Sequence, residues 1–184
     1  HRKLRKIAME KQRKLENKIK AEWNEAWLSI YNTWKEERKK IKEEYEARKQ
    51  KIQELYEKIK KIATKMGVKI DMPTLPKLEY PPEPKKPPMP KIPEYRYDEK
   101  RGILIEPDEI EIEKALIPIR RNKLMAKREA IKMREMGKEI IKKINLSFDA
   151  IEKKLIAEME KLKEMEKRKM KGRKIEELKR KYKK

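Results

Sequence analysis

The sequence contains no cysteine, and its single histidine is His1. Disulfides, thiolate metal sites and a histidine general base away from the chain's start are therefore excluded. Four dispersed glycines provide neither a glycine-rich phosphate loop nor a dinucleotide fingerprint. Carboxylate pairs such as Glu43-Glu44 and Glu176-Glu177 are interpreted as partners of nearby lysines on helix surfaces. We predict no enzyme activity, no cofactor, no metal site and no small-molecule substrate.

Apolar residues are also scarce. No run approaches the roughly 18 apolar residues that a membrane span requires, so we expect no transmembrane segment. Hydrophobic residues make up 36% of the chain and charged residues 48%, against about 25% charged in ordinary globular domains. Long amphipathic helices bury only one stripe each, and lysine, glutamate and arginine favour helix. The composition therefore predicts an all-α chain without a deep single core.

Proline divides the chain into three parts. All eleven prolines lie between Pro73 and Pro118, and nine of them lie in Pro73–Pro93. We predict an N-terminal helical arm over 1–66, a Pro-rich connector over 67–117 and a C-terminal helical arm over 118–184. The simplest arrangement of two matched arms is an antiparallel helical hairpin.

Inside the connector, the nine prolines favour polyproline II. Residues 95–97 and 103–105 flank a turn that contains Gly102, which predicts a small β-hairpin. The connector is interpreted as a stiff spacer or as a strap over a neighbouring subunit, with an SH3-type ligand as the alternative. We expect Gly67 to end the first helix and Pro118 to lie in the first turn of the second, after a short helical turn over 108–116.

Both arms carry apolar residues at helical spacing. In the first arm this seam comprises Leu15, Ile19, Trp23, Trp27, Ile30, Trp34, Ile41, Tyr45, Ile52, Leu55, Ile59, Ile62 and Met66. In the second arm it comprises Ile141, Ile144, Phe148, Ile151, Leu155, Met159, Leu162 and Met165, and it ends with Ile175, Leu178 and Tyr182. From Trp34 onward the spacing is that of a heptad seam interrupted by Arg38 and Arg48.

Positive charge is concentrated at the two ends of the sequence. Residues 1–20 hold nine Lys and Arg against two Glu, and residues 161–184 hold thirteen against four. These segments contribute +7 and +9 to a net charge of +22. In an antiparallel hairpin they would lie side by side and repel each other unless a polyanion neutralised them. The alternative is that lysine-rich ends only increase solubility.

The seam arginines and the aromatic residues each allow two interpretations. Arg38, Arg48 and Arg128 either meet phosphates, which suit the planar guanidinium, or bury their stems while the charge reaches water or a glutamate. The aromatic stripe from Trp23 to Trp34 either packs against a helix or subunit or stacks on bases. We predict the following aromatic residues at a subunit interface: Trp23, Trp27, Trp34, Tyr80, Tyr95 and Tyr97.

Taken together, the chain resembles the major coat proteins of filamentous, linear double-stranded-DNA viruses of hyperthermophilic archaea. The resemblance lies in two long basic amphipathic helices with a Pro-containing connection. It is carried by the opening stretch RKLRKIAMEKQRKLENKIK and the closing stretch EKLKEMEKRKMKGRKIEELKRKYKK. The high glutamate content departs from this pattern, because many carboxylates must then face away from DNA.

The resemblance implies a nucleocapsid subunit of a virion, assembled in the host cytoplasm, that wraps helices around double-stranded DNA. Its partners would be nucleic acid and copies of itself or a paralogous coat subunit. The implied nucleic-acid-binding residues are Arg2, Lys3, Arg5, Lys6, Arg13, Lys14, Arg38, Arg48, Arg120, Arg121, Arg128, Arg168, Lys169, Lys171, Arg173, Lys174, Arg180 and Lys181. Two other functions stay open: a cytoplasmic coiled-coil scaffold for protein interaction, and a ribosome- or RNA-associated helical protein.

Overall fold

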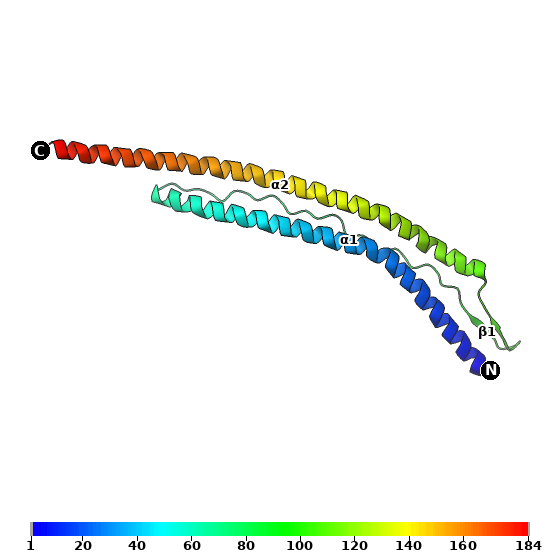
Figure 1. Cartoon of the computed structure of the whole chain (residues 1–184). Coiled ribbons are helices and arrows are strands. Elements are labelled where there is room, and N and C mark those ends of the chain that lie inside the picture. The colour runs from blue at the N-terminus through cyan, green and yellow to red at the C-terminus, as the bar shows by residue number, and fades with distance from the viewer. Residues whose placement is uncertain (1, 184) are drawn as a thin grey trace. The chain divides into compact units, whose positions relative to one another are not determined.

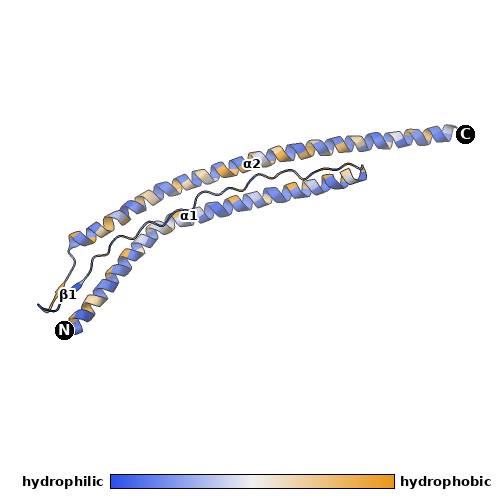
Figure 2. Cartoon of the chain, turned by 180° about the vertical axis from the view of Figure 1, so that it is seen from behind, coloured by the Kyte–Doolittle hydropathy of each residue, from blue (hydrophilic) through white to orange (hydrophobic). Residues whose placement is uncertain are grey.

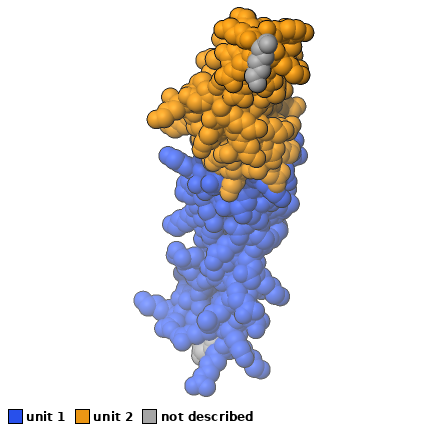
Figure 3. All heavy atoms as spheres, turned by 90° about the vertical axis from the view of Figure 1, so that its left-hand side faces the viewer, with its two compact units in different colours: residues 1–39, 81–137 blue, residues 40–80, 138–184 orange. Residues whose placement is uncertain are grey.

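The computed structural model describes residues 2–183 and is 76% helical (Figure 1). Its elements are α1 (Arg2–Lys65), β1 (Arg96–Asp98), β2 (Ile103–Ile105) and α2 (Glu109–Tyr182). The chain forms two compact units (Figure 3). Unit 1 comprises His1–Lys39 and Pro81–Gly137, and unit 2 comprises Lys40–Tyr80 and Lys138–Lys184. The prediction of two long helices and a small β-hairpin is confirmed.

Glycine ends α1 as the sequence predicts. Gly67 has a φ of 72°, a left-handed conformation that costs glycine little. Its N–H donates to the Thr64 carbonyl (3.2 Å), and the Val68 N–H donates to the Ala63 carbonyl (2.9 Å). These bonds satisfy carbonyl groups that the end of a helix otherwise leaves unpaired.

The β-hairpin pairs Arg96 with Ile105 and Asp98 with Ile103 in an antiparallel register. Its turn contains Gly102, which has a φ of 61° and donates its N–H to the Asp98 carbonyl (2.8 Å). The first strand therefore begins one residue later than the predicted segment 95–97.

The second helix begins earlier than predicted, and Pro118 lies inside it instead of in its first turn. The carbonyl of Asp108 accepts the first bonds, from the N–H groups of Glu111 (3.0 Å) and Ile112 (3.1 Å). An internal proline costs a helix about 3 kcal/mol. Here the flanking residues Leu116 and Ile119 are buried in the core of unit 1, which offsets that cost. The predicted short turn over 108–116 is therefore the start of one continuous helix.

Within each unit α1 and α2 run in the same direction, so the predicted antiparallel helical hairpin is wrong (Figure 1). In unit 1, Glu25 pairs with Lys123 (3.8 Å) and Glu37 packs against Gly137. A later residue of α1 thus contacts a later residue of α2, which is the pattern of two parallel helices. The two basic ends of the sequence consequently fall in different units.

The connector explains this direction, because it runs back along α1 before α2 begins. In unit 2, the Tyr56 hydroxyl donates to the Ile70 carbonyl and the Tyr45 hydroxyl to the Pro76 carbonyl, both at 2.9 Å. In unit 1, the Trp34 Nε1–H donates to the Pro81 carbonyl (2.9 Å) and Gln12 Nε2 to the Pro93 carbonyl (3.3 Å). Proline lacks an N–H, so the connector offers its carbonyl groups to side chains of α1. These bonds tie the strap to α1 of its own chain. Its predicted contact with a neighbouring subunit stays a prediction.

Each unit has its own apolar core. The predicted seams supply most of the core of unit 2 and the α1 side of unit 1, whereas the α2 side of unit 1 lies before the predicted second seam. Figure 2 shows apolar residues at intervals along both helices. In unit 2 the buried residues are Ile41, Ile52, Ile59, Ala63, Ile144, Phe148, Leu155 and Leu162. Connector residues of unit 2 pack against them, namely Ile70, Leu75, Leu78 and Tyr80. In unit 1 the buried residues are Leu15, Ile19, Ala115, Leu116 and Ile119, with Trp23, Ile92, Ile112 and Tyr95 packed around them.

The bond between Trp34 and the connector can be tested by Trp34→Phe. Trp34 is buried, and removal of its Nε1–H leaves the Pro81 carbonyl without that donor. We expect a loss of about 1–3 kcal/mol of unfolding free energy, measured by denaturant titration. Trp27→Phe is the matched control, because the buried Nε1 of Trp27 has no hydrogen-bond partner. Equal losses in the two variants would show that ring volume, and not the hydrogen bond, matters.

A second test concerns Gly137, which lies against the side chain of buried Glu37. A Cβ at Gly137 would overlap the Glu37 carboxylate, whereas a Cβ at Gly172 would meet nothing within 4 Å. Alanine favours helix over glycine by about 1 kcal/mol. We therefore expect Gly172→Ala to raise the melting temperature and Gly137→Ala to lower it. A stabilising Gly137→Ala would contradict this close packing.

Candidate nucleic-acid interface

The basic segment at the start of α1 lies beside an acidic segment of unit 1. Residues 94–113 hold eight Asp and Glu against three Lys and Arg, a net charge of −5. Arg5 pairs with Glu99, and Lys11 Nζ lies 2.6 Å from Glu106 Oε1. The hydrogen bond and the charge of Glu106 raise the pKa of Lys11 above its usual value. Much of the positive charge of this segment is therefore balanced within its own unit.

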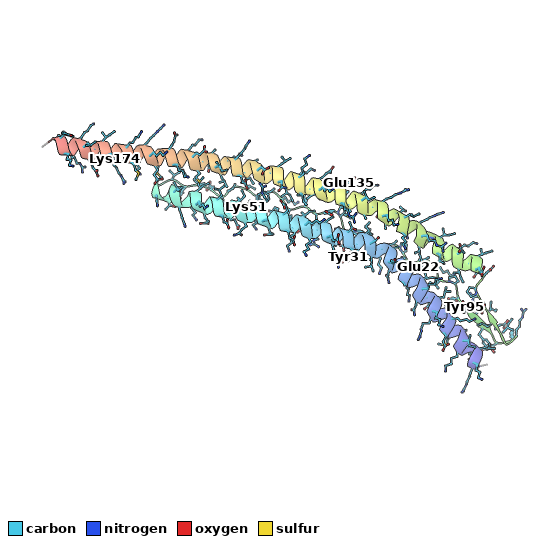
Figure 4. All side chains as sticks on the ribbon, in the orientation of Figure 1. Glu22, Tyr31, Lys51, Tyr95, Glu135 and Lys174 are labelled. Carbon is cyan, nitrogen blue, oxygen red and sulfur yellow. The ribbon has the colours of Figure 1, made fainter. Side chains whose placement is uncertain are left out.

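The basic segment at the end of α2 has a different environment. Arg48 of α1 pairs with Asp149 of α2, which lies 101 positions later in the sequence. With the same offset, the last residue of α1, Lys65, lies opposite about residue 166 of α2. The turns of α2 after that point extend past the end of α1. Every residue over 167–183 is exposed, and these residues hold ten Lys and Arg against two Glu. Figure 4 labels Lys174 on this part of α2.

The structure adds lysines that sequence reasoning missed. The segment 58–69, at the end of α1 and in the same unit, contains no acidic residue. Its exposed cations are Lys58, Lys60, Lys61, Lys65 and Lys69. We call these five lysines together with residues 167–183 the basic end of unit 2. The sequence does show that segment 58–69 contains five lysines and no acidic residue. It does not show that the end of α1 belongs to the same unit as the end of α2.

The predicted apolar seam does not continue through the basic end. Leu162 is the last buried residue of α2, whereas Ile175, Leu178 and Tyr182 are 53%, 52% and 85% exposed. The predicted seam positions are therefore wrong here. The reason is that α1 ends at Lys65, so these last turns have no helix of unit 2 opposite them.

The two seam arginines have different roles. Arg38 is exposed, and its guanidinium lies 5.5 Å from the centre of the Trp34 ring. The Arg48 side chain is only 17% exposed, and its Nη2 lies 2.6 Å from Asp149 Oδ1 and 3.4 Å from Glu152 Oε1. The structure thus favours the interpretation of Arg48 as a cross-seam ion pair over its interpretation as a phosphate ligand.

The predicted phosphate ligands on α2 in unit 1 are exposed, namely Arg120, Arg121 and Arg128. Arg120 Nη1 lies 3.8 Å from Glu113 Oε2. These arginines alternate along the helix with the exposed residues Ile117, Leu124 and Ile131. This face therefore offers both positive charge and apolar surface.

The predicted interface aromatics are largely engaged within the chain. Trp34 and Tyr80 pack against their own units, and Tyr95 packs against the core of unit 1. The stripe also stacks on itself, with 4.5 Å between the ring centres of Trp27 and Tyr31. The remaining predicted aromatics face cations of unit 1, since Lys86 Nζ lies 4.4 Å from the Trp23 ring and the Arg5 guanidinium 5.6 Å from the Tyr97 ring. Their role between subunits stays a prediction.

Two further properties concern the described part of the chain. Over residues 2–183, no three or more His, Cys, Asp or Glu side chains are placed to hold a metal ion. Neither helix, over the same residues, contains a stretch apolar and long enough to cross a membrane.

The ion pair of Arg48 leads to a test with Arg48→Leu. The leucine would fill a seam position next to Phe148, so we expect unfolding free energy to change by up to about 1 kcal/mol in either direction. The affinity of Arg48→Leu for a DNA duplex should stay within about twofold of that of the unchanged chain, because this guanidinium faces carboxylates. The slope of log affinity against log salt should not change. Fluorescence anisotropy at several salt concentrations measures both, and a shallower salt slope would show that Arg48 does contact phosphate.

The sequence matches no protein-family model, and no curated protein or solved structure is similar enough to count as a match. The resemblance to coat proteins of filamentous archaeal viruses thus stays a prediction.

Proposed function

We propose that this chain is a structural protein that binds and packages double-stranded nucleic acid by neutralising its phosphates. The basic end of unit 2 is the observation that carries this proposal. It presents fifteen lysines and arginines against two glutamates, all on exposed residues. Release of the counterions condensed on a duplex drives association with such a surface. Contacts to phosphates carry no sequence information, which suits a packaging role.

The helical form of the basic end supports a duplex ligand. Residues 167–183 span roughly 25 Å as helix, and a helical segment of this length without packing is marginally stable in water. Mutual repulsion of its cations weakens such a helix further. A polyanion laid along it would remove that repulsion and stabilise the helix.

The resemblance extends this proposal to a major coat protein in a helical nucleoprotein filament of a virion. In that setting Arg2–Lys14, Arg38 and Arg121 would be additional phosphate ligands, and copies of the chain or a paralogue would be the partners. We also propose that the connector takes a polyproline II conformation, supported by its nine prolines and by the carbonyl groups that it offers to α1.

A second candidate function is a coiled-coil scaffold for another protein. It is favoured by four exposed apolar residues on α2 at intervals of seven, Ile110, Ile117, Leu124 and Ile131. This spacing is the signature of a helix-packing seam. The apolar half of this face would gain nothing against phosphate, whereas a partner helix would bury it.

The proposal is tested by the triple variant Lys169→Gln, Arg173→Gln and Arg180→Gln. Its control, Lys142→Gln with Lys143→Gln and Lys153→Gln, removes the same charge from exposed positions of α2 in unit 2. The slope of log affinity against log salt should fall by about 0.9 for each phosphate that the variant no longer neutralises, and more in the first variant than in the control. Binding is measured by fluorescence anisotropy with duplex DNA and duplex RNA of equal length.

A salt-independent affinity, or equal decreases of the slope in the two variants, would reject the basic end as the binding surface. Electron microscopy of the intact chain with long duplex DNA tests packaging directly. Regular filaments are expected, and their absence at saturating protein would leave binding without assembly.

A further inference from the structure

The β-hairpin is docked on the first turns of α1 by polar contacts. The Tyr95 N–H donates to Gln12 Oε1 (2.8 Å), and Gln12 Nε2 donates to the Pro93 carbonyl (3.3 Å). In the same two segments, Glu99 pairs with Arg5 and Glu106 with Lys11. A groove of about 660 Å³ follows the contact and is lined by α1 and hairpin residues that include Arg13 and Tyr97. Figure 4 labels Tyr95 beside the first part of α1.

The charges on the two sides of this contact are opposite. Residues 1–20 carry +7, and residues 94–113 carry −5. Glu99 and Glu106 present anionic oxygens to Arg5 and Lys11 as phosphate oxygens would, since charge-assisted bonds of arginine and lysine suit both groups. The acidic segment thus has the chemistry of the polyanion that its neighbour is suited to bind.

We propose that residues 2–14 form a second polyanion site and that the acidic segment 94–113 occupies this site in the free chain. A phosphodiester polyanion enters the site by displacing Glu99 and Glu106. This inference rests on the proposed function, because it assigns a second site for the same class of ligand. It also ranks the two sites: the basic end of unit 2 binds first, and the start of α1 follows.

The strength of the contacts permits such an exchange. The side chains of Arg5 and Glu99 are 57% and 71% exposed, and those of Lys11 and Glu106 are 45% and 55% exposed. An exposed ion pair of this kind changes the equilibrium between the docked and the displaced acidic segment by no more than about fivefold. A two-stranded hairpin is itself marginally stable when it is isolated. A duplex that releases several counterions outweighs these contacts.

The experiment uses the chain with Lys169→Gln, Arg173→Gln and Arg180→Gln, in which the basic end is weakened. The test variant adds Glu99→Gln and Glu106→Gln to this chain. The matched control carries Glu36→Gln and Glu83→Gln, which make the same change in net charge at two glutamates of unit 1 outside the contact. We expect the first variant to bind a short DNA duplex, of about two helical turns, roughly fivefold more tightly than the control. Its salt slope should be steeper by up to about 1.8, because two more phosphates are neutralised.

Hydrogen exchange on the intact chain gives a second readout. The Tyr95 amide bonds to Gln12 only while the hairpin is docked, so duplex DNA should reduce its protection. Circular dichroism checks that each variant is folded. If the variant binds DNA no more tightly than the control, or if DNA leaves the protection of the Tyr95 amide unchanged, the second site is overturned. Duplex binding by the intact chain would still support the proposed function in that case. Failure of the intact chain to bind any duplex would overturn both.

Discussion

The hydrogen bonds between side chains of α1 and carbonyl groups of the connector determine how this chain is arranged. A proline-rich segment has few N–H groups, so it cannot pair with a strand and depends on donors from elsewhere. Tyrosine, tryptophan and glutamine side chains of α1 supply them along its length, as the bonds of Tyr45 and Trp34 illustrate. Because the connector is held against α1 on its way back, α2 begins near the start of α1 and runs in the same direction in each unit.

The parallel course changes the electrostatics of the chain. An antiparallel hairpin would bring two strongly positive segments together. Here the start of α1 lies beside the acidic segment 94–113 in unit 1, and the end of α2 shares unit 2 with the lysine-rich end of α1. One positive segment is therefore partly neutralised by carboxylates, whereas the other gains further positive charge. This asymmetry is the physical basis for ranking the two surfaces as polyanion sites.

A chain with so few apolar residues must also admit charged groups to its seams. Arg48 and Glu37 show two ways in which this happens. Arg48 reaches two carboxylates across the seam and lies 5.7 Å from the centre of the Phe148 ring. The buried Glu37 occupies the space that Gly137 leaves open on α2. Each of these charged side chains contacts residues of α2 where an apolar side chain would otherwise pack. The sequence alone does not show which α2 residues these are.

The sequence by itself determined the helices, the turn residues and most of the seams, because these depend on local spacing and backbone chemistry. Gly67 ends α1 and Gly102 lies in the hairpin turn, as predicted, and both have a positive φ. Most of the predicted seam residues of α1, and those of α2 from Ile144 to Leu162, are buried or half-buried. The direction of α2, the continuous helix through Pro118 and the exposure of Ile175 were decided by tertiary structure alone. Each depends on which residues lie opposite in space, and the periodicity within one segment contains no information about the register between two helices.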